Sequence, residues 1–229
     1  MINNRLNIIS LGTVDYGKAM RLQKIVHSQR VSNTRPDTLI LLEHPDTITL
    51  GRRAKRDDLL SSDEDLKKLG VKVFHTDRGG QATYHGKGQL IIYPIINIKD
   101  HNFGPISYVR FLEKLIKDTV GEFGIESTNY KNETGVWVYD NFKSKKKIAS
   151  IGVKISNGVT FHGVALNVST KLQMFNHIIP CGISSTEFTN VNNESESKIT
   201  FKQVSNVLIS KITLAFDKEP LYEDFYEKY

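Results

Sequence analysis

Cysteine is nearly absent from this chain of 229 residues, which contains only Cys181. A single thiol excludes an intramolecular disulfide framework and any thiolate cluster for zinc or iron–sulfur. Long hydrophobic runs are also missing. The longest, Leu90–Ile98, is interrupted by Pro94 and Asn97 and is shorter than the ~20 residues that span a bilayer. Because no signal-peptide segment opens the chain either, we expect a soluble, intracellular protein without a membrane span.

Nucleotide and metal motifs are missing as well. The segment around Gly86-Lys87 is not a Walker A loop, because Gln81 stands where the first glycine is required and Gly88 replaces Ser or Thr. No G-x-G-x-x-G follows a predicted strand. None of the seven histidines has the spacing of a zinc site. We therefore expect no metal and no cofactor.

The net charge of +6 permits an anionic partner without requiring one. Part of the excess lies in one run, Lys143 and Lys145 to Lys147. Such a run is usually a solvated loop, and the alternative is a basic module that binds RNA or another polyanion. Aromatic platforms and clustered arginines are missing, so we expect no nucleic-acid partner. The polar segment 184–198 is expected to be a mobile loop.

Predicted strands and helices intermix without a regular βαβ period, which favours a mixed α/β (α+β) fold in one domain over residues 1–229. Asp15 can cap a first helix, and Thr200 with Gln203 forms a capping box for a last helix that buries Val204, Val207, Leu208 and Leu214. The remaining expected elements are strands at 6–11, 38–43, 47–50, 71–75, 89–98 and 135–139, a short helix from Ser62 to Gly70, and a long helix over 106–123.

The strongest local signal is Asn157-Gly158 between two β-rich runs, which predicts a hairpin with a two-residue turn. This turn fixes the register, so that Ser150 opposes Ala165 and Gly152 opposes Gly163. These four small residues would form a trough along one face. The other face would be apolar, and strict alternation places Lys147 and His162 on it.

Two segments could carry chemistry. Asp77–Gln89 holds four glycines, which indicates positive φ angles or backbone amides close to a ligand, although an ordinary glycine-rich turn is the simpler interpretation. A lone intracellular cysteine is most often a small buried side chain. Cys181, however, lies between Pro180 and Gly182 in a predicted turn, which favours an accessible thiol. As a nucleophile it would need a nearby cation or base, for which His177, Lys147 and His162 are candidates.

Together these residues resemble the octanoyl (lipoyl) transferase family. The matching motifs are ordered along 6–189 and are Ser10-Leu-Gly with Asp15-Tyr, Arg78-Gly-Gly-Gln-Ala-Thr-Tyr-His85-Gly, Lys147-Ile-Ala-Ser-Ile-Gly152, Phe161-His-Gly-Val-Ala-Leu-Asn167 and Pro180-Cys-Gly182. One position departs from the family, since Lys87 stands where proline is usual. This replacement puts the rigidity of the loop in doubt.

The resemblance implies the fold of the biotin ligase and lipoate ligase superfamily. It implies that Cys181 accepts the acyl group and that Lys147 lowers the pKa of this thiol. The acyl site would be lined by Arg78, Gly79, Gly80, Gln81, Ala82, Thr83, Tyr84, His85, Ser150, Ile151, Gly152, Gly163, Val164 and Ala165.

The implied reaction moves octanoyl from octanoyl-acyl carrier protein to a lysine of lipoyl domains through a Cys181 thioester, without ATP. The alternative of the same fold is an ATP-dependent lipoate- or biotin-protein ligase, which would need no cysteine. Family members are cytoplasmic in bacteria and mitochondrial in eukaryotes. The Asn- and Lys-rich composition favours a mitochondrial enzyme from an AT-rich eukaryote.

Overall fold

The computed structural model describes residues 4–139, 144–180 and 186–224. Its elements form a mixed α/β fold, which confirms the predicted class. The strands are β1 (Arg5–Thr13), β2 (Thr38–Glu43), β3 (Thr47–Leu50), β4 (Lys72–His75), β5 (Ala82–His85), β6 (Gln89–Ile95), β7 (Thr128–Tyr130), β8 (Glu133–Tyr139), β9 (Lys145–Ser156), β10 (Val159–Asn167), β11 (Glu187–Phe188) and β12 (Glu219–Tyr222). The helices are α1 (Tyr16–Val31), α2 (Asp63–Lys68), α3 (Pro105–Gly121), α4 (Val191–Glu194) and α5 (Phe201–Phe216), with short 3-10 turns η2 (Arg56–Asp58), η3 (Ile98–His101) and η4 (Leu172–His177).

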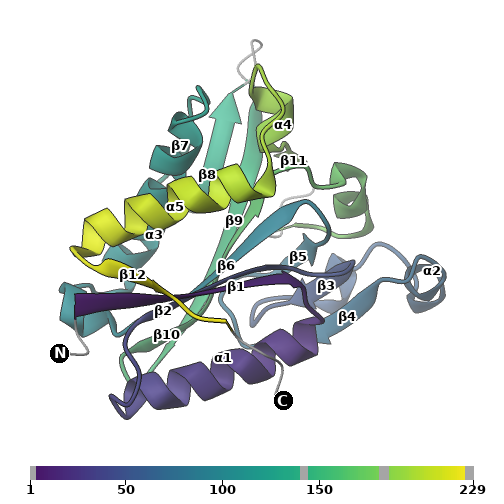
Figure 1. Ribbon diagram of the computed structural model, residues 1–229. Coiled ribbons are helices and arrows are strands. Elements are labelled where there is room, and N and C mark those ends of the chain that lie inside the picture. The colour runs from purple at the N-terminus through teal and green to yellow at the C-terminus, as the bar shows by residue number, and fades with distance from the viewer. Residues whose placement is uncertain (1–3, 140–143, 181–185, 225–229) are drawn as a thin grey trace.

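The described strands form one large and one small sheet. The large sheet has the order β12-β1-β2-β6-β10-β9-β8-β7, with β11 added to β9, and the small sheet has the order β4-β3-β5. Helix α1 covers one face of the large sheet, and α3 and α5 cover the other (Figure 1). Each helix layer encloses its own apolar core, and a third core, which includes Ile48 and Phe175, lies between the small sheet, α2 and η4.

Helix ends follow the predicted caps. The Asp15 side chain accepts hydrogen bonds from the first turn of α1, and Thr200 and Gln203 form the capping box of α5. The predicted buried stripe of α5 is correct for Val204 and Leu208 but wrong for Leu214, which is 80% exposed. Ile212, four residues after Leu208, is buried instead, because a helical stripe advances by three or four residues.

The β9–β10 hairpin has the predicted register. Ser156 pairs with Val159, Gly152 with Gly163 and Ser150 with Ala165. Asn157 and Gly158 both have positive φ angles, as a type I′ turn requires. The local turn chemistry was therefore sufficient to predict this pairing.

The segment 184–198, predicted to be a mobile loop, is described only from residue 186 onward. This part contains β11 and α4. Asparagine side chains supply the backbone partners that an apolar-poor segment needs, since Asn167 donates to Thr189 O at 3.0 Å and Asn190 caps α4. Polar composition here reflects a backbone held by side chains.

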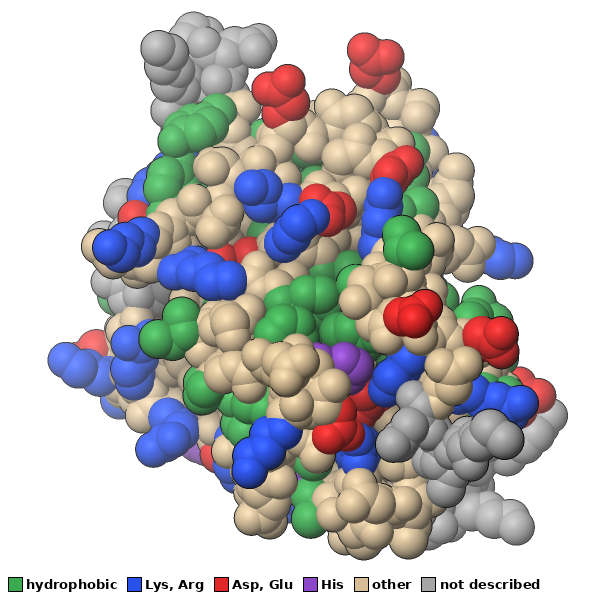
Figure 2. Space-filling model, turned by 90° about the vertical axis from the view of Figure 1, so that its left-hand side faces the viewer, with side chains coloured by type: hydrophobic (Ala, Val, Ile, Leu, Met, Phe, Trp, Pro, Cys, Tyr) green, Lys and Arg blue, Asp and Glu red, His purple; other side chains and the backbone are tan. Residues whose placement is uncertain are grey.

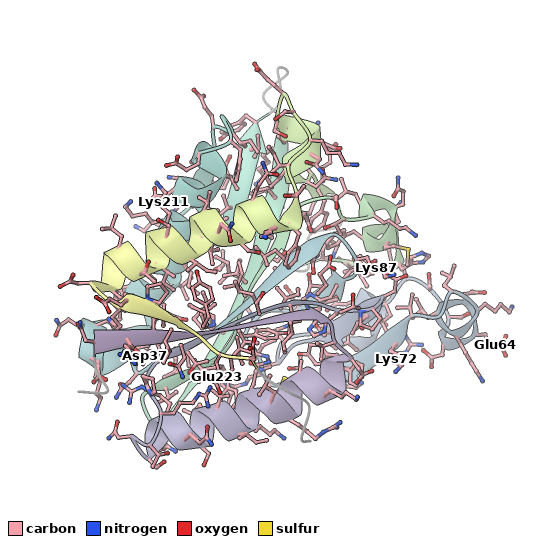
Figure 3. The ribbon with its side chains drawn as sticks, in the orientation of Figure 1. Asp37, Glu64, Lys72, Lys87, Lys211 and Glu223 are labelled. Carbon is pink, nitrogen blue, oxygen red and sulfur yellow. The ribbon has the colours of Figure 1, made fainter. Side chains whose placement is uncertain are left out.

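A buried ionic cluster holds the end of the sheet where β2 begins. The Asp37 carboxylate, with a side chain 0% exposed, binds Arg30, His101 and Lys218, each at 2.7 Å. Figure 3 shows Asp37 at this end of the molecule, opposite α2, where Glu64 projects outward. Burial alone would raise the pKa of Asp37, but the hydrogen bonds from His101, Arg30 and Lys218 hold it far below its usual range. Within the described residues, none of the helices combines the length and apolar character needed to cross a membrane.

Candidate active site

A cleft with about 520 Å³ of empty space lies between the α1 face of the β6–β10–β9 strands and the start of β5. Its walls include every residue predicted to line the acyl site except Gly79 and Tyr84. The Tyr84 ring packs against Phe175 in the small-sheet core, and its hydroxyl donates to Asp46 at 2.7 Å. Four residues that were not predicted to line the acyl site also line the cleft, and these are Tyr16, Ile91, Tyr93 and His162.

Arg78 clamps the glycine loop that forms one wall. The side chain is nearly buried, and its guanidinium donates to the carbonyl oxygens of Thr49 and Gln81, both at 2.7 Å. It also donates to Thr49 Oγ1 at 2.9 Å and to Gly79 O at 3.0 Å. The rigid fork of donors thus ties the loop to β3.

The predicted trough is largely filled by the protein itself. A Cβ atom at Gly152 would lie 2.8 Å from Gly79 O, because the loop that follows Arg78 crosses β9 there. A Cβ atom at Gly163 would lie 2.1 Å from Ile92 O on the neighbouring strand. These two glycines permit close backbone packing, and both line the cleft together with Ser150 and Ala165.

Neutral His85 lines the cleft, and His44 packs against it with the ring centroids 5.8 Å apart. Gln89 uses its amide group to donate to Tyr84 O and Asn167 Oδ1, so its Oε1 accepts from Nδ1–H of His85 at 2.8 Å. This pattern leaves Nε2 of His85 as an acceptor for the Thr49 hydroxyl at 3.3 Å. Burial lowers the pKa of His85 well below its usual value, and the neighbouring His44 adds to the shift.

His44 is fixed in the same way. Its Nδ1 lies 2.6 Å from Val14 O and must donate, and its Nε2 then accepts from the Tyr93 hydroxyl at 2.8 Å. Burial lowers the pKa of His44 to about 4. Neither ring carries charge at neutral pH, so this part of the cleft wall is compatible with an apolar ligand.

The Lys147 side chain does not lie on the face of β9 that strict alternation of side chains predicts. The β8–β9 register shifts by one residue between the Val136–Ala149 and Trp137–Lys147 pairs, which is a β-bulge at Ile148. Ile148 and Ala149 therefore both pack into the core beneath α3 and α5. Lys147 is turned to the opposite face, where its Nζ lies 4.4 Å from the centroid of the Trp137 ring.

Lys147 is 2% exposed, and its Nζ donates to Thr134 O at 3.3 Å. It lies in a chamber with about 840 Å³ of empty space that we call the Lys147 chamber. The chamber shares Gly80, Gln81, Ile151 and Gly152 with the cleft, so the two cavities adjoin at the glycine loop. Gly79, absent from the cleft wall, also lines the chamber.

Alternation fails at His162 as well. This residue has a φ of +58°, and its backbone N–H donates to the buried Gln23 of α1 at 2.8 Å. The ring thereby reaches the cleft, where Nε2 lies 2.9 Å from Asp77 Oδ1. Burial lowers the pKa of His162 despite this carboxylate. Although partial burial acts in the other direction, hydrogen bonds from Lys154 and His162 lower the pKa of Asp77 to about 2.

The remaining candidates lie elsewhere. Cys181 is outside the described residues, but Pro180 forms a bridge with Ala82 of the cleft wall. The ring of His177 contacts Ser61 Oγ at 2.7 Å and does not line either cavity. Lys87 is exposed at the turn between β5 and β6 (Figure 3), outside the cleft wall.

The described part of the lysine run is not the solvated loop that was expected. Lys145 and Lys146 are within β9, and Lys145 binds Glu133 at 2.6 Å while lying over the Trp137 ring. Lys147 is buried, and Lys143 is outside the described residues. Figure 2 shows the left-hand side of the molecule as seen in Figure 1. On this face both acidic and basic side chains surround a hydrophobic patch with a histidine at its edge. Within the described residues, no three potential ligands are grouped to hold a metal.

Comparison with known proteins identifies the family. The Lipoyl protein ligase A/B catalytic domain matches residues 15–213. An octanoyltransferase of Syntrophobacter fumaroxidans is 39% identical over 94% of this chain and 90% of its own length. A mitochondrial octanoyltransferase of Arabidopsis thaliana is 40% identical over 92% of this chain and 88% of its own length. This chain belongs to the octanoyltransferase family. It is an acyltransferase, and its activity is octanoyl transfer in lipoate biosynthesis.

Solved structures confirm the fold expected from the resemblance. A bi-partite lipoate protein ligase of Thermoplasma acidophilum superposes on the octanoyltransferase with a TM-score of 0.73 at 16% identity, over 100% of this chain and 89% of that one. A biotin protein ligase of Aquifex aeolicus, in complex with biotin and ATP, superposes with a TM-score of 0.55 at 16% identity. The match covers 92% of this chain and 70% of that one.

Several cavity residues were not predicted to line the site. Tyr16 lies on the buried side of α1, where ordinary core packing is the simpler interpretation. Tyr93 lies in an apolar strand, and Trp137 in the predicted strand 135–139. The buried amide of Gln23, which lines neither cavity, is a polar signal on the same helix, since it accepts from the His162 N–H.

Proposed function

We propose that this octanoyltransferase takes its octanoyl group from octanoyl-acyl carrier protein onto Cys181 and passes it to a lysine of a lipoyl domain. One observation carries the proposal: a cleft with apolar surface, whose cation Arg78 is bound to backbone carbonyl oxygens, adjoins a chamber that holds the buried Lys147. The bridge between Pro180 and Ala82 supports the placement of the Cys181 segment beside this junction.

The cleft supports a role in holding the acyl chain. Ile91, Val164 and Ala165 supply apolar surface, and the neutral His85 adds no charge that a bound acyl chain would desolvate. The acyl carbon would then lie at the junction, where Gly80 and Gln81 line both cavities. Their amides are the donors we assign to the oxyanion, each worth about 3–4 kcal/mol when well placed.

The reaction has two displacements. The Cys181 thiolate attacks the thioester carbonyl, and the carrier-protein thiolate leaves and takes up a proton. The lipoyl-domain amine then attacks the Cys181 thioester, loses a proton, and releases the thiol as the amide forms. We assign to Lys147 the stabilisation of the Cys181 thiolate and the transfer of these protons, because its ammonium is fixed in the chamber.

Intact-mass spectrometry tests this function. Wild-type protein mixed with octanoyl-acyl carrier protein, without acceptor or ATP, should gain the mass of one octanoyl group. When lipoyl domain is then added, the enzyme should lose the octanoyl mass and the lipoyl domain should gain it. The Cys181→Ala variant is the control and should gain nothing.

An ATP-dependent ligase would give a different result. It would leave the protein unmodified in this experiment and would transfer octanoate to the lipoyl domain only with ATP. The mitochondrial compartment has support from the Arabidopsis relative alone, while the Syntrophobacter relative is bacterial.

A further inference from the structure

A surface groove leads into the Lys147 chamber. It has about 1530 Å³ of empty space and lies between the first turns of α3, the β7–β8 turn and the outer edge of β9. We call it the β9-edge groove. It shares Val109, Asn132, Thr134 and Val153 with the Lys147 chamber. Groove, chamber and cleft therefore adjoin in that order, which is the geometry for a long, thin ligand.

The floor of the groove is an open strand edge. Strand β8 pairs with β9 only between Lys145 and Ala149, so the outer edge of β9 beyond Ala149 has no strand partner among the described residues. The two-residue turn sets the direction of each backbone group, and those of Ile151, Val153 and Ile155 point outward. The Gly79 amide already donates to Val153 O at 3.0 Å, which confirms this direction, so Val153 O is occupied and the other outward backbone groups form the open part of the edge. Such an edge binds amide groups of an extended ligand.

The mouth of the groove is cationic. Arg52 and Lys131 line it from opposite elements, and neither has an ion pair with a carboxylate of the described residues. The backbone of Arg52 is held in place because its N–H donates to Arg78 O at 3.1 Å. The other cations are occupied, since Lys154 binds Asp77 and Arg110 binds Glu113. Two exposed cations are therefore left for an anionic group.

We propose that the β9-edge groove binds the phosphopantetheine arm of the donor. Its phosphodiester lies between Arg52 and Lys131, and its two amides pair with the open edge of β9. Its thioester then reaches the Lys147 chamber, and the octanoyl chain continues into the cleft. This inference rests on the proposed function in taking acyl carrier protein as the donor.

A series of three donors tests the placement of the phosphate. The donors are octanoyl-acyl carrier protein, S-octanoyl-4′-phosphopantetheine and S-octanoyl-pantetheine, which lacks the phosphate. The double variant Arg52→Gln/Lys131→Gln should raise KM for the two phosphate-bearing donors about fivefold or more, as expected for two exposed ion pairs. KM for octanoyl-pantetheine should stay within about twofold, and added salt should reduce the difference between wild type and variant.

Lys87→Gln is the matched control, because it removes an exposed lysine outside the groove and should change no KM. An equal effect on all three donors, or no effect on any, would refute the phosphate site. An effect on the carrier protein alone would assign the two cations to the carrier's surface and overturn the proposal. So would a raised KM for the lipoyl domain. Octanoylation of wild-type Cys181 by octanoyl-pantetheine reports on the proposed function separately.

Discussion

Replacing Arg78 by methionine should loosen the wall between cleft and chamber. The side chain of methionine keeps much of the apolar contact but loses the guanidinium hydrogen bonds to the carbonyl oxygens of Thr49, Gln81 and Gly79. A hydrogen bond to a charged group contributes about 1.5–3 kcal/mol. Because Gln81 O keeps a donor in the Gly51 N–H at 3.2 Å, we expect the combined loss in the free energy of unfolding to be about 3 kcal/mol, with a fall of about 1 M or more in the urea midpoint.

Activity should fall by more than stability requires. At moderate temperature most molecules stay folded, yet the loop that contains Gly80 is no longer tied to β3, so kcat for octanoyl transfer should decrease about tenfold or more. Arg78→Lys keeps the charge but can reach fewer acceptors and should be intermediate in both measurements. This order of the three proteins distinguishes a clamp from a simple charge requirement.

Arg56→Met is the matched control. Arg56 is 61% exposed and pairs with the 81% exposed Asp63, so its replacement should change the unfolding free energy by less than about 0.5 kcal/mol. The clamp interpretation is wrong if Arg78→Met denatures at the same urea concentration as Arg56→Met and retains full kcat.

Three other changes test separate parts of the structure. Lys147→Met should raise the pKa of Cys181 and slow its alkylation by iodoacetamide at pH 7, with partial recovery at higher pH. Lys145→Met, which removes a partly exposed lysine from the same strand, should not, and coincident rate profiles would contradict the assignment. Gly163→Val should destabilise the fold as measured by thermal unfolding, since its Cβ would lie 2.1 Å from a β6 carbonyl; a folded variant that only excludes long acyl chains would refute this reading. Asp37 has a lowered pKa in the folded state, so its stabilising contribution is complete above about pH 4 and is lost as the pH falls further. Asp37→Asn should therefore lower the free energy of unfolding at pH 7 by about 3–5 kcal/mol. It should also make this free energy depend less on pH below about pH 4. Unchanged urea midpoints would show that the cluster contributes nothing.

Local chemistry explains which parts of the structure were predictable. The β9–β10 register follows from Asn157-Gly158, because two residues with positive φ determine all later pairs. The ends of α1 and α5 follow from Asp15 and Thr200 for the same reason, since each cap lies within one helical turn of the backbone groups that it binds.

The misses depend on contacts between distant segments. Strand β5 was hidden in a glycine-rich segment, and it forms because β3, more than thirty residues earlier, supplies its partners. Gly152 was interpreted as the floor of an open trough, whereas the loop at Gly79 fills the space above it. The predicted face of Lys147 was wrong because β9 contains a bulge. The bulge depends on how β8 pairs with β9, which the composition of β9 does not reveal.

The bulge at Ile148 also makes the spacing along β9 functionally significant. Deleting Ile148 would restore strict alternation and turn the Lys147 ammonium into the apolar core beneath α3 and α5, without changing any residue of either cavity. The number of residues between Lys147 and Ser150 therefore determines whether the ammonium reaches the chamber. A sequence alignment that places a gap at Ile148 would therefore align Lys147 with a residue that lies on the opposite face of the strand.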